Sequence, residues 1–394
     1  MIQQGSSLGL YALTLGAFAI GTTEFVPVGL LPEIAQDLHV SIPAAGFLVT
    51  GYALGVAIGG PAFTLALSRV NRKTVLMLML LFFIAGNGIA ASANDYGVLL
   101  LARIITAFNH GTFFGVGAVV AGSLVPKERG ASAIATMFLG LTVAMVMGVP
   151  FGAFVGQRLG WHAPFAFIAL IGVLALLGVW ALVPSIPSQR PRLVAELRTL
   201  ASAPVVLSLL TTLLGFGGVF VLFTYISPLL RQVSGFAPPA VAAILVLFGV
   251  GTLLGNIAAG KAADRSLGRT LLVTIGGLAV VLAISSFMWP HAPLAIIATF
   301  AIGFFGFATA TPLQLLVIRA ASQAPNLASS ANISAFNIGN AVGAAFGAIV
   351  IADGLPLQWL GLCAASVSFA GGLVAIPAYR RSDASIATRS ARSS

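Results

Sequence analysis

Twelve long apolar runs divide the chain, and each is long enough to cross a membrane as a helix. A helix needs about 20 mainly apolar residues to span a hydrocarbon core of roughly 30 Å. The runs cover residues 8–31, 43–67, 75–93, 97–122, 131–157, 163–184, 204–230, 240–262, 270–289, 293–318, 327–352 and 357–379. Because backbone polar groups in lipid must be hydrogen-bonded internally, the sequence predicts an all-α membrane protein of twelve transmembrane helices.

The composition excludes a soluble protein of this length. Of 394 residues, 59% are hydrophobic and 7% are charged, whereas soluble domains carry about 25% charged residues. The net charge is +10, but the basic residues do not cluster with aromatic residues, so we expect no nucleic-acid partner. One cysteine, Cys363, and four scattered histidines leave no thiolate cluster or disulfide framework. We therefore expect no metal and no cofactor.

The basic residues fix the expected orientation in the membrane. Sixteen of the nineteen follow even-numbered runs or lie in the tail: Arg69, Arg72, Lys73, Lys127, Arg129, Arg190, Arg192, Arg198, Lys261, Arg265, Arg269, Arg319, Arg380, Arg381, Arg389 and Arg392. The opposite side has Arg158 and Arg231, and Arg103 lies inside the fourth run. Since cytoplasmic loops are enriched in Lys and Arg, both termini are predicted to be cytoplasmic.

The chain also contains an internal duplication. An offset of 196 residues maps Pro32, Pro43, Gly55, Gly59 and Arg69 onto Pro228, Pro239, Gly251, Gly255 and Arg265. A shift of six helices preserves orientation, so the halves are predicted to be parallel repeats, an arrangement that suits alternating access.

The repeat and the polar stretches together predict the domain organisation. We expect a six-helix bundle at 1–184, a cytoplasmic linker at 185–203, a second bundle at 204–379 and a cytoplasmic tail at 380–394. In the linker, Leu193, Leu197 and Leu200 recur at helical spacing, which indicates a short interfacial helix.

A lone carboxylate and a lone guanidinium lie inside the spans. Of nine acids, only Glu24 is within a run, and Arg103 is the only cation well inside one. Each costs at least about 2.5–3.5 kcal/mol near the centre of a membrane helix. Both lie roughly 10 Å below the outer surface, at 1.5 Å per residue, so we expect them to face inward and meet. A change in their separation would turn Glu24 from proton holder to proton donor, unless the pair only fixes two helices.

Other polar side chains in the spans are candidates for a solute cavity. His110 lies two turns from Arg103 on the same helix face, where it either relays protons, binds solute or stays neutral in a local hydrogen bond. The candidate cavity residues are Tyr52, Asn109, Phe113, Asn256, Asn332 and Asn337. Amides also join helices to one another, at about 0.6 kcal/mol each.

Two sequence motifs resemble those of a known transporter family. Gly260, Asp264, Arg265, Gly268 and Arg269 resemble the loop signature of the major facilitator superfamily, with one extra residue before Gly268. The equivalent first-half loop keeps its bases, including Arg69, but has lost the glycines and the aspartate. The resemblance implies that Asp264 latches the cytoplasmic side, and it leaves that role in doubt for the first-half loop.

The fifth run carries the more specific clue to export. Gly140, Ala144, Gly148, Pro150, Gly152 and Gly156 lie there, and they are similar to the G-x-P-x-G motif of the drug:proton antiporters in that superfamily. Small residues every fourth position let helices approach closely, as they also would at Gly339, Gly343 and Gly347 in the eleventh run.

Motifs at the end of run one and within run four add to the resemblance, which runs over the whole chain. The stretch from Thr22 to Gly29, and Arg103 followed by Asn109, His110 and Gly111, resemble arabinose-inducible and sugar-efflux permeases. The resemblance implies a monomeric inner-membrane exporter of a drug-like or sugar-like solute, driven by protons, in the lipid bilayer and without enzymatic activity.

Several alternatives stay open on sequence grounds. A symporter of the same fold could also use one carboxylate, and a receptor built on a transporter fold is not excluded. A membrane enzyme is less favoured, because the G-x-S-x-G spelling at Gly5–Gly9 precedes the first run without a strand-to-helix turn. A channel would need a pore loop or a charged ring, and a Walker-type loop is absent from the sequence.

Overall fold

The computed structural model describes residues 7–126, 129–187, 199–321 and 325–393. Within these ranges, every regular element is a helix, and twelve helices are long and apolar enough to cross a membrane. The predicted fold class and the predicted number of spans are therefore confirmed.

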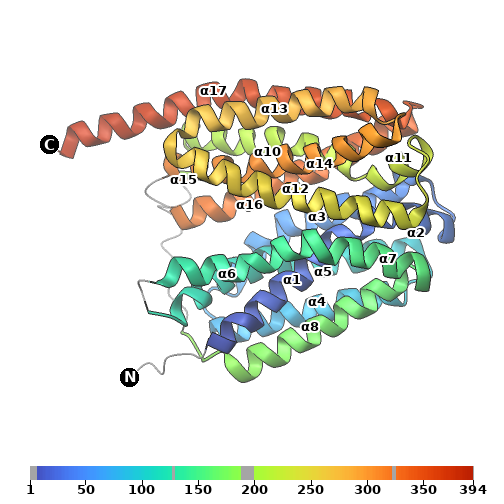
Figure 1. The fold of residues 1–394 in the computed structure, drawn as a ribbon. Coiled ribbons are helices and arrows are strands. Elements are labelled where there is room, and N and C mark those ends of the chain that lie inside the picture. Colours follow the sequence, from blue (N-terminus) through green and yellow to red (C-terminus); the bar gives the residue numbers. More distant parts are fainter. Residues whose placement is uncertain (1–6, 127–128, 188–198, 322–324, 394) are drawn as a thin grey trace. The chain divides into compact units, whose positions relative to one another are not determined.

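The chain divides into two compact units, which we describe separately (Figure 1). Unit 1 comprises residues 1–191 and 237–246, and unit 2 comprises residues 192–236 and 247–394. Residues 188–198 of the predicted linker, with Leu193 and Leu197, lie outside the described residues, as does Lys127. Leu200 is described, and it packs against a small buried cluster of unit 2 that contains Val205.

Unit 1 contains the first six spans. Its elements are α1 (Ser7–Gly29), α2 (Leu31–Asp37), α3 (Ile42–Ala66), α4 (Arg72–Ala91), α5 (Tyr96–Ser123), α6 (Gly130–Val143), the π-helical turn η2 (Ala144–Gly148), α7 (Val149–Leu159) and α8 (His162–Leu182). The first residues of α12 (Pro238–Arg265) also belong to this unit.

Unit 2 contains the remaining spans and most of α12. Its other elements are α10 (Ala203–Phe223), α11 (Ile226–Gln232), α13 (Leu267–Met288), α14 (Ala292–Ala308), α15 (Ala310–Ala320), α16 (Pro325–Ala352), the 3-10 turn η3 (Leu357–Trp359) and α17 (Leu360–Ser393). The offset of 196 places Pro32 of α2 on Pro228 of α11. Each of these short helices follows the long first helix of its unit.

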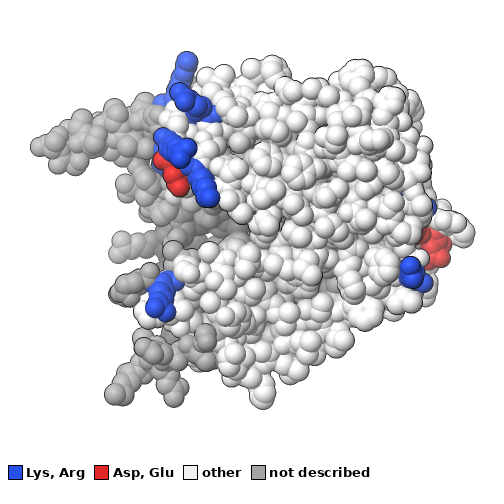
Figure 2. Space-filling model, in the orientation of Figure 1, with Lys and Arg blue, Asp and Glu red and all other residues white. Residues whose placement is uncertain are grey.

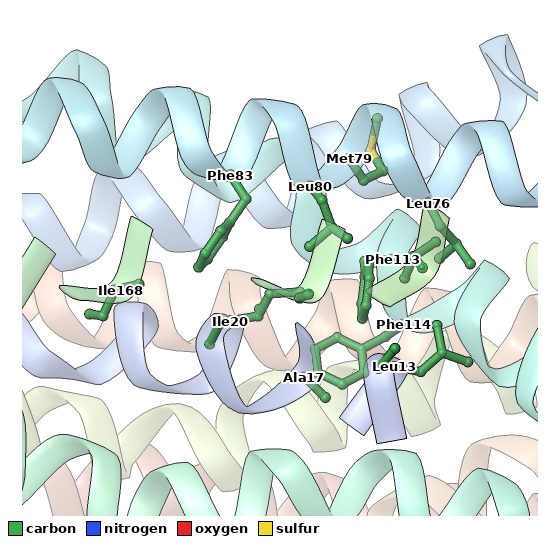
Figure 3. Close-up of a cluster of buried hydrophobic side chains, with 14 of the residues drawn as sticks. Leu13, Ala17, Ile20, Leu76, Met79, Leu80, Phe83, Phe113, Phe114 and Ile168 are labelled. Carbon is green, nitrogen blue, oxygen red and sulfur yellow. The ribbon is translucent and has the colours of Figure 1, made fainter. Parts of the chain in front are cut away.

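A core of large apolar side chains holds unit 1 together around α1. Leu13, Ala17 and Ile20 of α1 are buried in the same cluster as Phe83 of α4 and Phe113 of α5 (Figure 3). Because lipid tails are as apolar as these side chains, the core stabilises the bundle through close packing rather than through removal from water.

Charged side chains lie at the ends of the helices. On the face shown in the space-filling view, the described Lys, Arg, Asp and Glu residues leave the flanks of the helices of each unit uncharged (Figure 2). An example is Asp95, which precedes α5 and accepts hydrogen bonds from the backbone N–H groups of Gly97 and Val98 at 2.8 and 3.2 Å. Such a cap supplies acceptors to the free N–H groups at a helix start.

Glycine faces bring helices together in both units. In unit 2, a Cβ at Gly339 or Gly343 of α16 would meet the backbone of α10 at Leu213 or Gly217, so the two helices are in direct contact there. In unit 1, Gly140 meets α1 in the same way, at the backbone of Thr14 and Phe18. The small residues thus set the close spacing of these helix pairs.

Candidate functional site

Four buried ionisable residues of the spans gather at one place in unit 1. Glu24 comes from α1, Tyr52 from α3, and Arg103 and His110 from α5. All four are buried, with exposed fractions of 8% for Glu24 and 1% for Arg103. The expectation that Glu24 and Arg103 face the interior of a bundle agrees with this burial, since charged groups are costly in lipid.

Arg103 contacts α1 through the backbone rather than through the Glu24 carboxylate. Nη1 donates a hydrogen bond to the carbonyl oxygen of Thr23 at 2.5 Å, and Nη2 donates to the carbonyl oxygen of Glu24 at 3.1 Å. The guanidinium carbon lies 4.1 Å from the centre of the Tyr52 ring, a cation–π contact that helps to stabilise a desolvated cation. The Arg103 Nε has no hydrogen-bond partner.

The carboxylate of Glu24 faces His110 instead. Its Oε2 lies 3.7 Å from Nδ1 of His110, which is too long for a hydrogen bond but close enough for two opposite charges to interact strongly. The same Nδ1 lies 3.2 Å from the Tyr52 hydroxyl. A proton can therefore be held by Glu24 or by His110, with the tyrosine hydroxyl as a hydrogen-bond partner for the imidazole.

The Phe114 ring also packs against the imidazole. The His110 ring centre is 5.0 Å from that of Phe114, which stacks on Phe138 at 5.1 Å. Phe113, one of the candidate cavity residues, is fully buried in the hydrophobic core of unit 1 (Figure 3). Asn109 is also fully buried, and neither its amide nitrogen nor its amide oxygen has a hydrogen-bond partner. A buried polar group without a partner is costly, so the Asn109 amide is suited to a bound solute or water.

The sequence analysis did not identify one further pair at this site. The Thr23 hydroxyl donates a hydrogen bond to Oδ1 of Asn87 at 2.6 Å, and Asn87 Nδ2 donates to the carbonyl oxygen of Phe83 at 2.9 Å. Asn87 is buried in α4. A single asparagine in the middle of an apolar run was the available signal, because a buried amide in a membrane helix needs partners.

The fifth run, which carries the G-x-P-x-G pattern, packs on the turn of α1 next to Glu24. Gly148 faces Thr22, and Gly152 faces Val26. Pro150 follows the π-helical turn η2, an irregularity that is frequent at functional sites. The motif therefore determines how closely α7 approaches the part of α1 that holds the carboxylate.

The candidate residues of unit 2 form hydrogen bonds to neutral side chains or to the backbone. Thr311 of α15 donates to Asn256 Oδ1 at 2.6 Å. Asn332 Nδ2 of α16 donates to Gln314 Oε1 at 2.7 Å, and Gln314 Nε2 donates to the Ser329 hydroxyl at 2.7 Å. Asn337 donates back to the carbonyl oxygen of Ile333 at 2.9 Å, and its own Oδ1 has no partner.

The loop-motif residues lie near the C-terminal ends of α12 and α3. Asp264 and Arg265 are exposed at the C-terminal end of α12, Arg69 is exposed after α3, and Gly260 has open space where a side chain would start. In the part of the chain that the structure describes, there is also no group of three His, Cys, Asp or Glu side chains that could hold a metal ion.

Twelve helices that are long and apolar enough to cross a membrane, with ionisable side chains buried among those of unit 1, define an integral membrane protein. The comparison with known families agrees, because residues 13–332 match the Major Facilitator Superfamily. The chain therefore belongs to the Major Facilitator Superfamily, and it is a multi-pass inner-membrane transporter.

Similar proteins support the same assignment. The inner membrane transport protein YdhP of Escherichia coli K12 is 46% identical over 360 residues, which cover 91% of this chain and 92% of that protein. A probable sugar efflux transporter of Helicobacter pylori is 29% identical over 376 residues, and the match covers 95% of each chain. A crystal structure of the nucleoside transporter NupG matches the fold with a TM-score of 0.75 at 13% identity, over 94% of this chain and 100% of that one.

Proposed function

We infer that the protein exports a small organic solute, drug-like or sugar-like, in exchange for protons and by alternating access. The observation that carries this proposal is the buried Glu24 carboxylate, 3.7 Å from His110 inside a transporter span. An ionisable group inside a membrane protein is a candidate proton site, because its burial is costly and such groups mark proton and ion pathways.

In this proposal, proton binding and solute binding use different sets of side chains. Glu24 and His110 hold the proton, with Arg103 beside them. In unit 1, Asn109 and Tyr52 are the proposed hydrogen-bond partners of the solute, and Phe113 supports α5, which carries Asn109. In unit 2, the neutral Asn256, Asn332 and Asn337 are candidate solute contacts of that unit. Amide and hydroxyl groups suit a hydroxylated or amphipathic solute, since they both donate and accept hydrogen bonds.

The direction of transport rests on the export motif and on one relative. Gly148, Pro150 and Gly152 match the antiporter pattern, and the similar protein of Helicobacter pylori is named a probable sugar efflux transporter. In this proposal Gly260, Asp264 and Arg265 form the latch of the conformational cycle, and Arg69 marks the equivalent first-half loop, which has lost the glycines and the aspartate.

Gradient-driven transport in proteoliposomes tests this function. Monosaccharides, disaccharides and amphipathic dyes are first screened for thermal stabilisation of the purified protein, and the best stabiliser becomes the transport probe. An acidic vesicle interior drives probe uptake by an antiporter, because protons leave as the solute enters. An acidic exterior drives uptake by a symporter.

The expected result is uptake into vesicles with an acidic interior by the wild type and its loss in Glu24→Gln. Asp353→Asn is the matched control, because Asp353 is an exposed carboxylate outside the spans. Undiminished gradient-driven uptake by Glu24→Gln would remove Glu24 from the mechanism, and uptake that needs an acidic exterior would replace antiport by symport.

A further inference from the structure

Helix α1 carries a proline one turn after the residues that meet Arg103. Pro27 lies inside the helix, and proline has no backbone N–H to donate to the carbonyl four residues earlier. That carbonyl belongs to Thr23. A helix without this hydrogen bond leaves a buried acceptor unsatisfied in the span, where no bulk water can replace the missing donor.

The Arg103 guanidinium supplies the hydrogen-bond donor that Pro27 lacks. Its Nη1 donates to the Thr23 carbonyl and its Nη2 to the Glu24 carbonyl, at 2.5 and 3.1 Å. Thr23 is itself fully buried, and its side chain is tied to Asn87 of α4. Two nitrogens of one planar group thus bind two successive carbonyls of α1, a two-pronged contact that guanidinium geometry allows.

The contact fixes the backbone of the residue that bears the carboxylate. Since the guanidinium binds the Glu24 backbone, the Glu24 side chain is free to reach His110. The titratable and charged groups that face this carboxylate are His110 and Arg103 of α5 and Tyr52 of α3. The arginine acts on the carboxylate both as a nearby charge and as the anchor of its backbone.

We propose that Arg103 is a positioning residue, whose guanidinium replaces the N–H donor that Pro27 removes from α1 and thereby holds Glu24 in register with His110. This inference rests on the proposed function, in which Glu24 is the proton site. The proposed role differs from that of a charge pair between Arg103 and Glu24, because the essential partners of the guanidinium are the two backbone carbonyls.

Replacement of Arg103 by lysine separates its two roles, which are to supply a nearby charge and to anchor the backbone of α1. Arg103→Lys keeps the positive charge, but an ammonium is a single point donor and cannot match the two-pronged contact. Pro27→Ala restores a backbone N–H that can bond to the Thr23 carbonyl. If positioning matters, Pro27→Ala therefore compensates for Arg103→Lys. If charge alone matters, Arg103→Lys behaves like the wild type.

The readout is the protonation of Glu24, which needs no transported solute. Infrared difference spectra recorded across a pH series follow the carbonyl band of the protonated carboxyl, assigned by its loss in Glu24→Gln. Arg103→Lys is expected to move the midpoint by about one pH unit, a tenfold change in proton affinity. The Pro27→Ala/Arg103→Lys double variant is expected to return it close to the wild-type value.

Thermal unfolding of the same proteins in detergent supplies the second readout. Arg103→Lys should lower Tm in the wild-type background and by about half that amount in the Pro27→Ala background, since interacting sites are not additive. Pro61→Ala is the matched control, because Pro61 is the proline inside α3. The effects of Pro61→Ala and Arg103→Lys on Tm should be additive in the double variant.

Three results would overturn the proposal. They are a wild-type midpoint in Arg103→Lys, an equal midpoint shift in both backgrounds, and the same coupling with Pro61→Ala. If Arg103→Lys is recovered unfolded, the comparison is the yield of monodisperse protein, which Pro27→Ala must restore. A protein that transports no solute but shows this coupling would refute the proposed function and leave the role of Arg103 standing.

Discussion

At the scale of residues, a buried proton site needs partners that differ in kind. Arg103 binds main-chain carbonyls, whereas Glu24 faces an imidazole that a tyrosine hydroxyl also contacts. Burying two isolated charges would cost several kcal/mol each. The two carbonyl dipoles and the Tyr52 ring offset the desolvation cost of the Arg103 cation. The Glu24 carboxylate can still exchange a proton.

The Tyr52 hydroxyl should tune proton exchange without being needed for folding. Tyr52→Phe keeps the ring beside Arg103 but removes the hydroxyl that lies 3.2 Å from His110 Nδ1. We expect a loss of stability of about 1 kcal/mol and an altered pH profile of solute counterflow. Thermal unfolding and counterflow at a series of pH values measure both effects.

Tyr96→Phe is the matched control for this change. Tyr96 belongs to α5, and its hydroxyl donates to the carbonyl of Ala44 in α3 at 2.6 Å, so the variant loses one tyrosine hydrogen bond between the same two helices. Its pH profile should match the wild type. A Tyr52→Phe profile that also matches the wild type would exclude a role of the hydroxyl in proton exchange.

The sequence could predict that Glu24 and Arg103 are near each other but not how they touch. The depth of a residue in the membrane follows from counting residues along its helix, and this count placed Glu24 and Arg103 at the same depth. The acceptors of Arg103 are backbone atoms, and a pattern of side chains does not reveal them. The signal for this contact was Pro27, four residues after Thr23, because a proline identifies the carbonyl that loses its donor.

At the scale of elements, the span count was predictable because it depends on apolar length alone. The division of one apolar run into α1 and α2, and of another into α14 and α15, was not predictable, since hydropathy does not report backbone direction. Likewise, the sequence places small residues along the fifth run, but only the structure shows that α6 and α7 press them against α1.

This close contact makes Gly140 sensitive to a single added methyl group. A Cβ at Gly140 would collide with the backbone of Thr14 and Phe18 in α1, so Gly140→Ala should destabilise the protein by about 1–3 kcal/mol through overpacking. Thermal unfolding in detergent measures the effect.

Gly88→Ala provides the contrast, because nothing lies within 4 Å of a Cβ at that position in α4. Since alanine favours helix over glycine by up to about 1 kcal/mol, this variant should be neutral or more stable. Equal stability of Gly140→Ala and the wild type would show that α6 and α1 are not in the tight contact described.

At the scale of the whole molecule, the two repeats share a plan but not a chemistry. Both begin with a long helix followed by a short one, at Leu31–Asp37 and Ile226–Gln232. Ionisable groups are buried within the spans of unit 1, whereas the polar contacts inside the described spans of unit 2 are those of amides and hydroxyls. We interpret this difference as a placement of proton handling in unit 1.

In an antiporter, proton and solute compete, so each weakens the binding of the other by the same factor. Proton release on solute binding therefore tests the central claim most directly. The best stabilising solute is added to the purified protein in weakly buffered detergent solution, and the pH change is recorded. The account predicts release of about one proton per bound solute by the wild type, and none by Glu24→Gln that still binds the solute. Equal release by Glu24→Gln, or none by the wild type, would contradict it.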